Sequence, residues 1–282
     1  MYQEKNMATV ISQNKKVLVT GGGNGIGREL CRCFHRGGYS LVAVSLVMDE
    51  LISLREELKP VAPGQTVTIL QKDLSDNDAA ESVFEFCERE GIEIDILVNN
   101  AGYGLVGRHL DLDTDRVKRM VVLNMMTMTV LCQLFGRKMR ERRRGSILNV
   151  ASTISFQPLP FWAVYAGTKA CVSSFSQALA GEMKEYGVSV TCLYPGTTAT
   201  NFLDSAGLVK SKGRWSVGSL IHGAAMDAGK VARAGYRGVL KKRPRVIPGL
   251  SNRLHFCLIH WIPNRLITAV VHGFMKMYRK PA

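Results

Sequence analysis

The strongest constraint on the fold is a repeated alternation of short apolar runs with segments of helical length. The apolar runs lie at Lys16–Thr20, Ser40–Ser45, Thr66–Leu70, Ile94–Asn100, Gly145–Ser152 and Val188–Pro195. Strands buried on both faces lose the alternation of polar and apolar residues, and strands separated by helices pair in parallel. The sequence therefore predicts an α/β fold with a doubly wound, Rossmann-like parallel sheet in a single domain.

Two flanking segments and one irregular stretch interrupt this pattern. We expect three parts, which are a flexible segment at 1–14, the α/β domain at 15–250 and an extension at 251–282. A helix near residues 227–240 and the run Arg245–Gly249 would supply the last edge strand. Residues 197–225 mix glycines with isolated large apolar residues, which predicts a lid of loop and helix.

Composition excludes several classes of protein. Seven cysteines without a CxxC pair argue against a disulfide framework, and six histidines without HExxH-like spacing predict no metal. The sequence contains no apolar run of about 18 residues, which is the length that would predict a membrane-spanning helix. The N-terminus also lacks the apolar run of a secretory signal. We therefore expect a cytoplasmic protein with reduced cysteines.

The positive charge is concentrated at one end of the chain. The net charge is +14, and twelve Lys or Arg but no Asp or Glu follow Asp227. Between residues 265 and 280 apolar and basic residues alternate with helical period, which predicts a basic amphipathic helix. Such a helix docks on its own domain or on a second subunit, or lies on a membrane surface. The apolar residues among the charges argue against nucleic acid as the partner.

A glycine-rich turn separates the first apolar run from the first helical segment. The turn reads Thr20-Gly-Gly-Gly-Asn-Gly-Ile-Gly27. Glycines allow the backbone to approach a pyrophosphate, and the N–H groups and dipole of a helix N-terminus favour that anion. The turn thus predicts a dinucleotide site, and the alternative is an ordinary tight turn. The expected binding residues are Gly21, Gly23, Asn24, Gly25, Ile26 and Gly27.

Tyr165 and Lys169 are four residues apart in a helical segment, so their side chains share one face. A phenol with its usual pKa of about 10 is a poor base near neutrality. An adjacent ammonium would lower the pKa of the phenol and make it usable for proton transfer. The alternative is an incidental surface pair.

These residues, together with Asn124, Ser152 and the stretch Asn99–Gly102, make the chain resemble the short-chain dehydrogenase/reductase family. The resemblance covers residues 15 to 250 and is closest to a bacterial cytosolic group of largely unassigned substrate. Further matching segments are Ile147–Thr153, Phe156–Ala170, Tyr194–Thr200 and the start of the extension.

The resemblance implies a nicotinamide-dependent oxidoreductase that interconverts a carbonyl and an alcohol. It implies that Ser152 hydrogen-bonds the substrate oxygen and that Tyr165 protonates it as hydride arrives. Asn124 would hold a water that links Lys169 to solvent, and Lys169 would also bind the nicotinamide ribose. The alternatives are a helix-interior amide bonded to a neighbouring loop for Asn124 and a strand-end turn residue for Ser152.

The family pattern also implies further cofactor contacts, and it implies a dimer or tetramer built on two long helices. Asp73 would face the adenine amino group, or cap the helix that follows. The remaining expected contacts are Leu74, Asn100, Ala101, Gly102, Pro195, Gly196, Thr198 and Thr200, beside Tyr165 and Lys169 themselves.

Cofactor choice depends on the end of the second apolar run. An acidic residue there holds the ribose 2′-OH of NAD, whereas a basic residue meets the 2′-phosphate of NADP. The position is Leu46, which has neither charge, and Arg28, directly after the glycine turn, is the nearest plausible cation. The sequence therefore favours NADP(H), with NAD(H) as the alternative.

The substrate side of the expected site carries no charge. Its variable residues are Phe156, Leu159, Phe161, Trp162, Phe202 and Trp215. They favour an apolar carbonyl substrate, or else they pack the lid. A nucleotide-binding redox sensor without turnover is the competing function, and the complete Ser, Tyr and Lys set argues against it.

Overall fold

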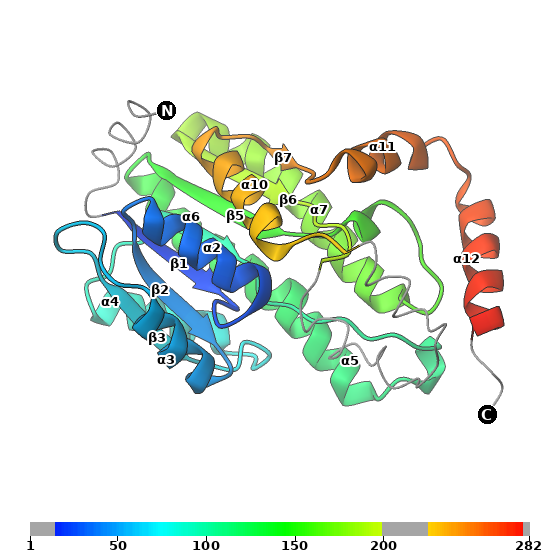
Figure 1. Ribbon diagram of the computed structural model, residues 1–282, viewed down its shortest axis with the longest axis horizontal. Coiled ribbons are helices and arrows are strands. Elements are labelled where there is room, and N and C mark those ends of the chain that lie inside the picture. The colour runs from blue at the N-terminus through cyan, green and yellow to red at the C-terminus, as the bar shows by residue number, and fades with distance from the viewer. Residues whose placement is uncertain (1–14, 199–224, 279–282) are drawn as a thin grey trace.

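The computed structural model describes residues 15–198 and 225–278, so the N-terminal segment and most of the expected lid lie outside it. Its centre is a seven-stranded sheet in the order β3-β2-β1-β4-β5-β6-β7 (Figure 1). The strands are β1 (Lys16–Thr20), β2 (Ser40–Ser45), β3 (Val67–Gln71), β4 (Ile96–Asn99), β5 (Gly145–Val150), β6 (Val188–Leu193) and β7 (Arg245–Val246). All neighbours pair in parallel, so the predicted doubly wound sheet is confirmed.

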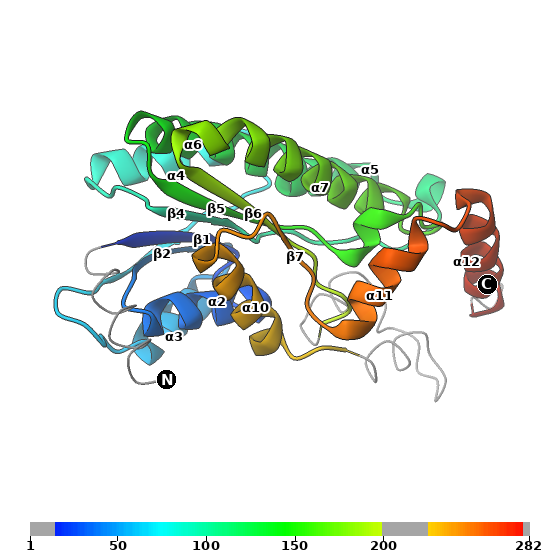
Figure 2. The same ribbon diagram turned by 90° about the horizontal axis from the view of Figure 1, so that it is seen from above.

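Helices cover both faces of the sheet (Figure 2). One face carries α2 (Gly25–Arg36), α3 (Met48–Glu57) and α10 (Ala228–Leu240), and the other carries α4 (Ala79–Arg89), α6 (Met128–Glu141) and α7 (Ala163–Met183). The strand order reverses between β1 and β4. In sheets of this kind the ligand crevice lies at that point, beyond the carboxyl ends of the strands.

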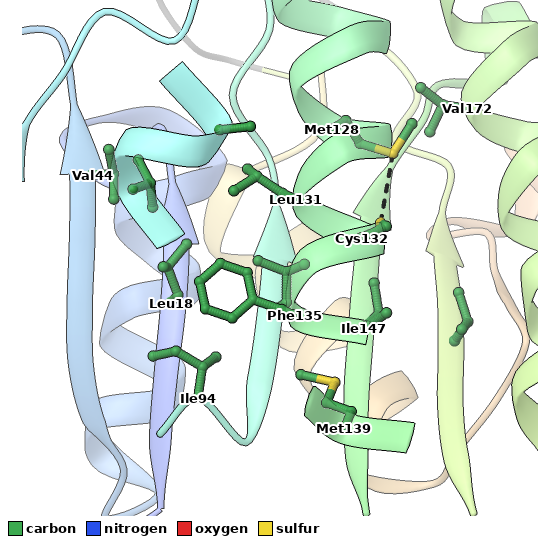
Figure 3. Close-up of a cluster of buried hydrophobic side chains, with 14 of the residues drawn as sticks. Leu18, Val44, Ile94, Met128, Leu131, Cys132, Phe135, Met139, Ile147 and Val172 are labelled. Atoms are coloured by element: carbon green, nitrogen blue, oxygen red, sulfur yellow. Dashed lines mark hydrogen bonds between the residues drawn. The ribbon is translucent and has the colours of Figure 1, made fainter. Parts of the chain in front are cut away.

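Two apolar cores hold these layers to the sheet. Along β1, Leu18 faces the core beneath α6, whereas Val17 and Val19 face the core beneath α2. Figure 3 shows the first of these cores, where Leu131 and Phe135 of α6 pack over Leu18. Because β1 is buried on both sides, each of its central positions is apolar, which explains the missing alternation in its sequence.

The helical stretch Thr114–Glu141 consists of three consecutive segments. These are α5 (Thr114–Val121), the π-helical η2 (Val122–Thr127) and α6. Such π-helical turns are frequent at functional sites, and Asn124 lies in this one. By length and composition the stretch Thr114–Glu141 passes as a membrane span, although no apolar run in the sequence predicted one. An 18-residue part of this stretch is 44% buried inside the protein.

The C-terminal extension forms two helices, of which the second corresponds to the predicted amphipathic helix and the first was not predicted. They are α11 (Leu250–Ile259) and α12 (Asn264–Tyr278), and Pro263 lies in the turn between them. Proline lacks a backbone N–H and cannot continue a helix that precedes it, which explains the break. In Figures 1 and 2, α12 stands at one end of the molecule, at the far right in both views.

Candidate active site

A cleft of about 480 Å³ lies at the carboxyl ends of the central strands. Its walls come from the segments after β1, β4, β5 and β6 and from the start of α7. The described residues that line it are Gly21, Asn24, Gly25, Ile26, Asn100, Ala101, Gly102, Val150, Ala151, Ser152, Thr153, Ile154, Trp162, Tyr165, Lys169, Pro195, Gly196, Thr197 and Thr198. Segments far apart in sequence therefore meet where the topology predicts a ligand site.

The glycine turn has a backbone that other residues would not tolerate. Gly21 has φ +63°, and a Cβ on Gly27 would lie 1.9 Å from the Gly21 carbonyl oxygen. Helix α2 begins at Gly25, its N-cap Asn24 makes no side-chain cap, and its first turn carries no acidic residue. The first N–H groups of α2 are thus available to an anion, and the turn fits the phosphates of a dinucleotide.

Thr20, which sequence reasoning missed, joins this turn to the segment after β4. Its hydroxyl accepts hydrogen bonds from the backbone N–H groups of Asn100 and Ala101. The Asn100 amide in turn donates to the carbonyls of Thr20 and Gly21. A buried hydroxyl directly before the glycines is the signal that could have identified this residue.

Tyr165 and Lys169 lie on the same side of α7, in the wall of the cleft. The Lys169 Nζ is 6.0 Å from the centre of the Tyr165 ring and donates a 2.8 Å hydrogen bond to the Val150 carbonyl. Both side chains are buried, with 6% and 5% of their surface exposed. The pair is therefore held inside the protein rather than on its surface.

Burial has opposite effects on the two protonation equilibria. It raises the pKa of Tyr165 above its usual value, and a hydrogen bond with Ser152 opposes that rise. It lowers the pKa of Lys169 to about 8. The sequence predicted that the ammonium would lower the pKa of the phenol, whereas in the structure burial raises that pKa and Ser152 supplies the opposing effect. At pH 7 the phenol holds its proton and the lysine is mostly charged.

Ser152 begins the short helix η3 (Thr153–Phe156) directly after β5. Its hydroxyl accepts from the Ile154 N–H at 3.3 Å and lies 3.5 Å from the Pro195 carbonyl oxygen. Together with its hydrogen bond to Tyr165, these contacts place the hydroxyl beside the phenol, within the cleft.

Asn124 lies behind the cleft wall and does not line it. Its amide nitrogen donates to the Tyr103 carbonyl and the Thr168 hydroxyl, and its oxygen accepts from the Tyr103 N–H. A Cβ on Gly102 would lie 2.9 Å from the Asn124 oxygen and 3.4 Å from the Lys169 Nζ. Asn124 thus ties the segment after β4 to α7 immediately beside Lys169.

Several predicted cofactor residues do not line the cleft. Leu74 is buried in the core, and Leu46 is 58% exposed at the end of β2. Asp73 accepts hydrogen bonds from Ser75 and pairs with Arg119. Gly23 and Gly27 shape the turn without reaching the cavity, and Thr200 lies outside the described residues.

The charged groups between the start of α2 and α3 already have partners. Arg28 pairs with Glu57 and donates to the Ser53 hydroxyl and to the carbonyls of Gly23 and Glu50. The Glu50 carboxylate accepts from the Asn24 amide at 2.7 Å. A 2′-phosphate would have to compete with Glu57 for the guanidinium.

Of the described apolar residues predicted for the substrate side, Trp162 lines the cleft, and its ring lies 5.7 Å from that of Tyr165. Phe156 packs instead on Tyr194 and Phe256. Phe161 stacks on His272, and Leu159 lines a separate groove beside α12. Phe202 and Trp215 lie outside the described residues. Ile154, which the sequence did not single out, contributes to the cleft.

Comparisons with known proteins show the family to which the chain belongs. A family model described as short chain dehydrogenase matches residues 15–208. The chain is 34% identical over 187 residues to a short chain dehydrogenase of Pseudocercospora fijiensis, which covers 66% of this chain and 60% of that protein. It is 30% identical over 205 residues to 17-beta-hydroxysteroid dehydrogenase type 3 of Homo sapiens, covering 71% and 65%. These matches span less than two thirds of either relative.

Among solved structures, a short-chain dehydrogenase from Sphingobium yanoikuyae in complex with NADPH superposes with a TM-score of 0.75 at 26% identity. The superposition covers 95% of this chain and 97% of that one. The chain thus belongs to the short-chain dehydrogenase/reductase family.

Proposed function

We propose that the protein interconverts a carbonyl and an alcohol with NADP(H) or NAD(H), and that Tyr165 is its general acid and base. The observation that supports this most is the convergence of Ser152, Tyr165 and Lys169 on one cleft, next to the free N-terminus of α2. A bound nicotinamide supplies the hydride for reduction, or accepts it in the reverse direction.

In reduction, the Ser152 hydroxyl orients the substrate oxygen toward Tyr165. The phenol, which holds its proton near neutral pH, donates that proton to the oxygen as negative charge develops there. Lys169 lies beside the ring and stabilises the phenolate that forms. Its lowered pKa of about 8 leaves it mostly charged at pH 7. In oxidation the same groups act in the opposite order.

For Asn124 we propose a positioning role beside Lys169. Its oxygen accepts a hydrogen bond from the Tyr103 N–H, and an amide oxygen has room for a second. That second position suits the water that the family resemblance places between Lys169 and solvent.

We propose NADP(H) as the favoured cofactor. The uncharged Leu46 offers no carboxylate to repel a 2′-phosphate, and a structural neighbour carries NADPH. We assign the phosphates to Gly21, Asn24, Gly25 and Ile26, with Gly23 and Gly27 shaping the turn. The adenosine side is assigned to Leu46, Asp73, Leu74 and Asn100–Gly102, and the nicotinamide side to Pro195, Gly196, Thr198 and Thr200.

We further propose an apolar substrate. Lys169 is the one charged side chain among the described residues of the cleft, and Trp162 and Ile154 present apolar surface to it. The protein would act in the cytoplasm as a dimer or tetramer. Residues 15–250 would form the oxidoreductase domain, and 251–282 would contact a membrane surface.

A panel of aliphatic, aromatic and steroid ketones, scanned with NADPH and NADH, tests this proposal. We expect oxidation of NADPH with apolar ketones, and its loss in Ser152→Ala. Absence of turnover with every ketone, despite tight nucleotide binding, would instead support the non-catalytic redox sensor.

A further inference from the structure

The exposed apolar side chains of the protein cluster in its C-terminal extension. Fourteen large hydrophobic side chains are exposed in the described residues, and eight of them lie between Leu250 and Phe274. On α11 the exposed residues follow a four-residue spacing at Leu250, Leu254 and Leu258. On α12 Leu266 and Val270 continue that spacing, and Trp261 between the helices is 86% exposed.

Other residues of α11 and α12 than these exposed leucines, Val270 and Trp261 dock the extension on the domain. Ile259 and Ile267 are buried, and Phe256 packs on Phe156 of η3. His272 stacks on Phe161 at 5.6 Å. Each helix therefore uses one face to attach to the protein and leaves a second apolar face in solvent. Contiguous exposed apolar surface of this kind marks a site of interaction with a protein or a membrane.

The charges around this surface select the partner. Arg253, Arg265 and Lys276 are exposed, and none of them pairs with an acidic residue in the described part of the chain. No Asp or Glu follows Asp227. A second copy that docked through the same surface would bring like charges together. An anionic bilayer instead offers negative headgroups to the basic residues and an apolar layer to the leucines.

We propose that Leu250, Leu254, Leu258, Trp261, Leu266 and Val270 form a membrane-binding face for anionic lipid bilayers. Apolar side chains would enter the headgroup and acyl boundary, where tryptophan is favoured, while the basic residues meet lipid phosphates.

The extension also touches the wall of the cleft. A Cβ on Gly196, which lines the cleft, would lie 2.5 Å from the Asn252 amide nitrogen. His272 reaches Phe161, which directly precedes the cleft residue Trp162. A bilayer on the α11–α12 face therefore lies beside the site. On the proposed function, this arrangement supplies the enzyme with apolar carbonyl compounds that dissolve in the bilayer.

Flotation of the full chain with vesicles tests the membrane-binding face. One set of vesicles contains phosphatidylcholine alone and the other contains phosphatidylcholine with phosphatidylserine. We expect the protein to float with the anionic set, and added salt to weaken the binding. The double substitution Leu258→Glu with Val270→Glu should reduce the floated fraction by about tenfold or more, because it puts carboxylates on the apolar face.

Leu110→Glu is the matched control, since Leu110 is 94% exposed outside the extension. It should float like the parent. The proposal is overturned if the parent floats with neither set of vesicles, or if the double variant floats as well as the parent. It is also overturned if the parent does not float and the double variant instead dissociates an oligomer, which would assign the face to a second copy.

Activity on a water-soluble ketone separates this proposal from the proposed function. The double variant should reduce such a ketone at the parent rate. A protein that floats but reduces no ketone would retain the membrane-binding face and refute the oxidoreductase chemistry.

Discussion

The Lys169 Nζ lies 6.0 Å from the centre of the Tyr165 ring and donates its hydrogen bond to the Val150 carbonyl rather than to the phenol. The cation is thus held next to the phenol by the last residue of β5. It is close enough to stabilise a phenolate when the proton leaves, and the phenol remains protonated until then.

The buried ammonium should make the stability of the protein depend on pH. The pKa of Lys169 falls from 10.5 to about 8 on burial. Below pH 8 the lysine is charged in both the folded and the unfolded states, so the full desolvation cost is present. Between pH 8 and 10.5 the folded protein loses this proton first, and the cost falls. The free energy of unfolding should therefore rise through this window, by roughly 3 kcal/mol at most.

Lys169→Met should abolish this rise in the free energy of unfolding between pH 8 and 10.5. Denaturant unfolding of the parent and the variant from pH 7 to pH 10 measures the difference between their free energies of unfolding. The contributions of the other titrating groups cancel in this difference. We expect the variant to be the more stable of the two at pH 7 and to lose turnover. Lys230→Met, at an exposed lysine, should follow the parent. Parallel curves for the parent and Lys169→Met would contradict the lowered pKa.

The glycine turn should not tolerate even a methyl group at Gly27. Gly27→Ala places a Cβ 1.9 Å from the Gly21 carbonyl oxygen, so the turn must move. We expect the free energy of unfolding to fall by roughly 2–3 kcal/mol. We also expect nucleotide binding, measured by titration, to be lost. Gly181→Ala in α7 meets no atom within 4 Å and should gain about 0.5–1 kcal/mol with unchanged binding. Unimpaired nucleotide binding by Gly27→Ala would show that this turn does not hold the phosphates.

Leu46 should set the cofactor preference. Its side chain is 58% exposed at the end of β2, so a charged residue there costs little stability. Leu46→Arg should lower the KM for NADPH relative to NADH by about tenfold, and Leu46→Asp should shift the ratio the opposite way. Val61→Arg, at a similarly exposed position, is the control. Equal ratios of the KM for NADPH to the KM for NADH in all three variants would show that the adenosine ribose does not bind beside Leu46.

Period and spacing made much of the fold predictable from the sequence. The central positions of β1 and β2 are apolar because both faces of the sheet are covered, and four residues of helix necessarily bring Tyr165 and Lys169 to one face. The glycine turn could be located for a similar reason, because its place between a strand and a helix is local information.

Properties that depend on distant partners could not be predicted. The guanidinium of Arg28 is engaged by Glu57, 29 residues away, and nothing local indicates it. The raised pKa of the phenol follows from burial by several segments, and the π-helical turn at Asn124 has no sequence signature. The stacking of Phe161 on His272 of the extension likewise needed the three-dimensional structure.

The central claim is that the Tyr165 phenol delivers the proton, and Tyr165→Phe tests it most directly. Its single-turnover rate of carbonyl reduction and its affinity for NADPH should be measured beside those of the parent. We predict unchanged NADPH affinity and a rate lower by about a hundredfold to ten-thousandfold, since the ring remains and only the proton donor is lost. A variant that reduces carbonyls at the parent rate would contradict the mechanism.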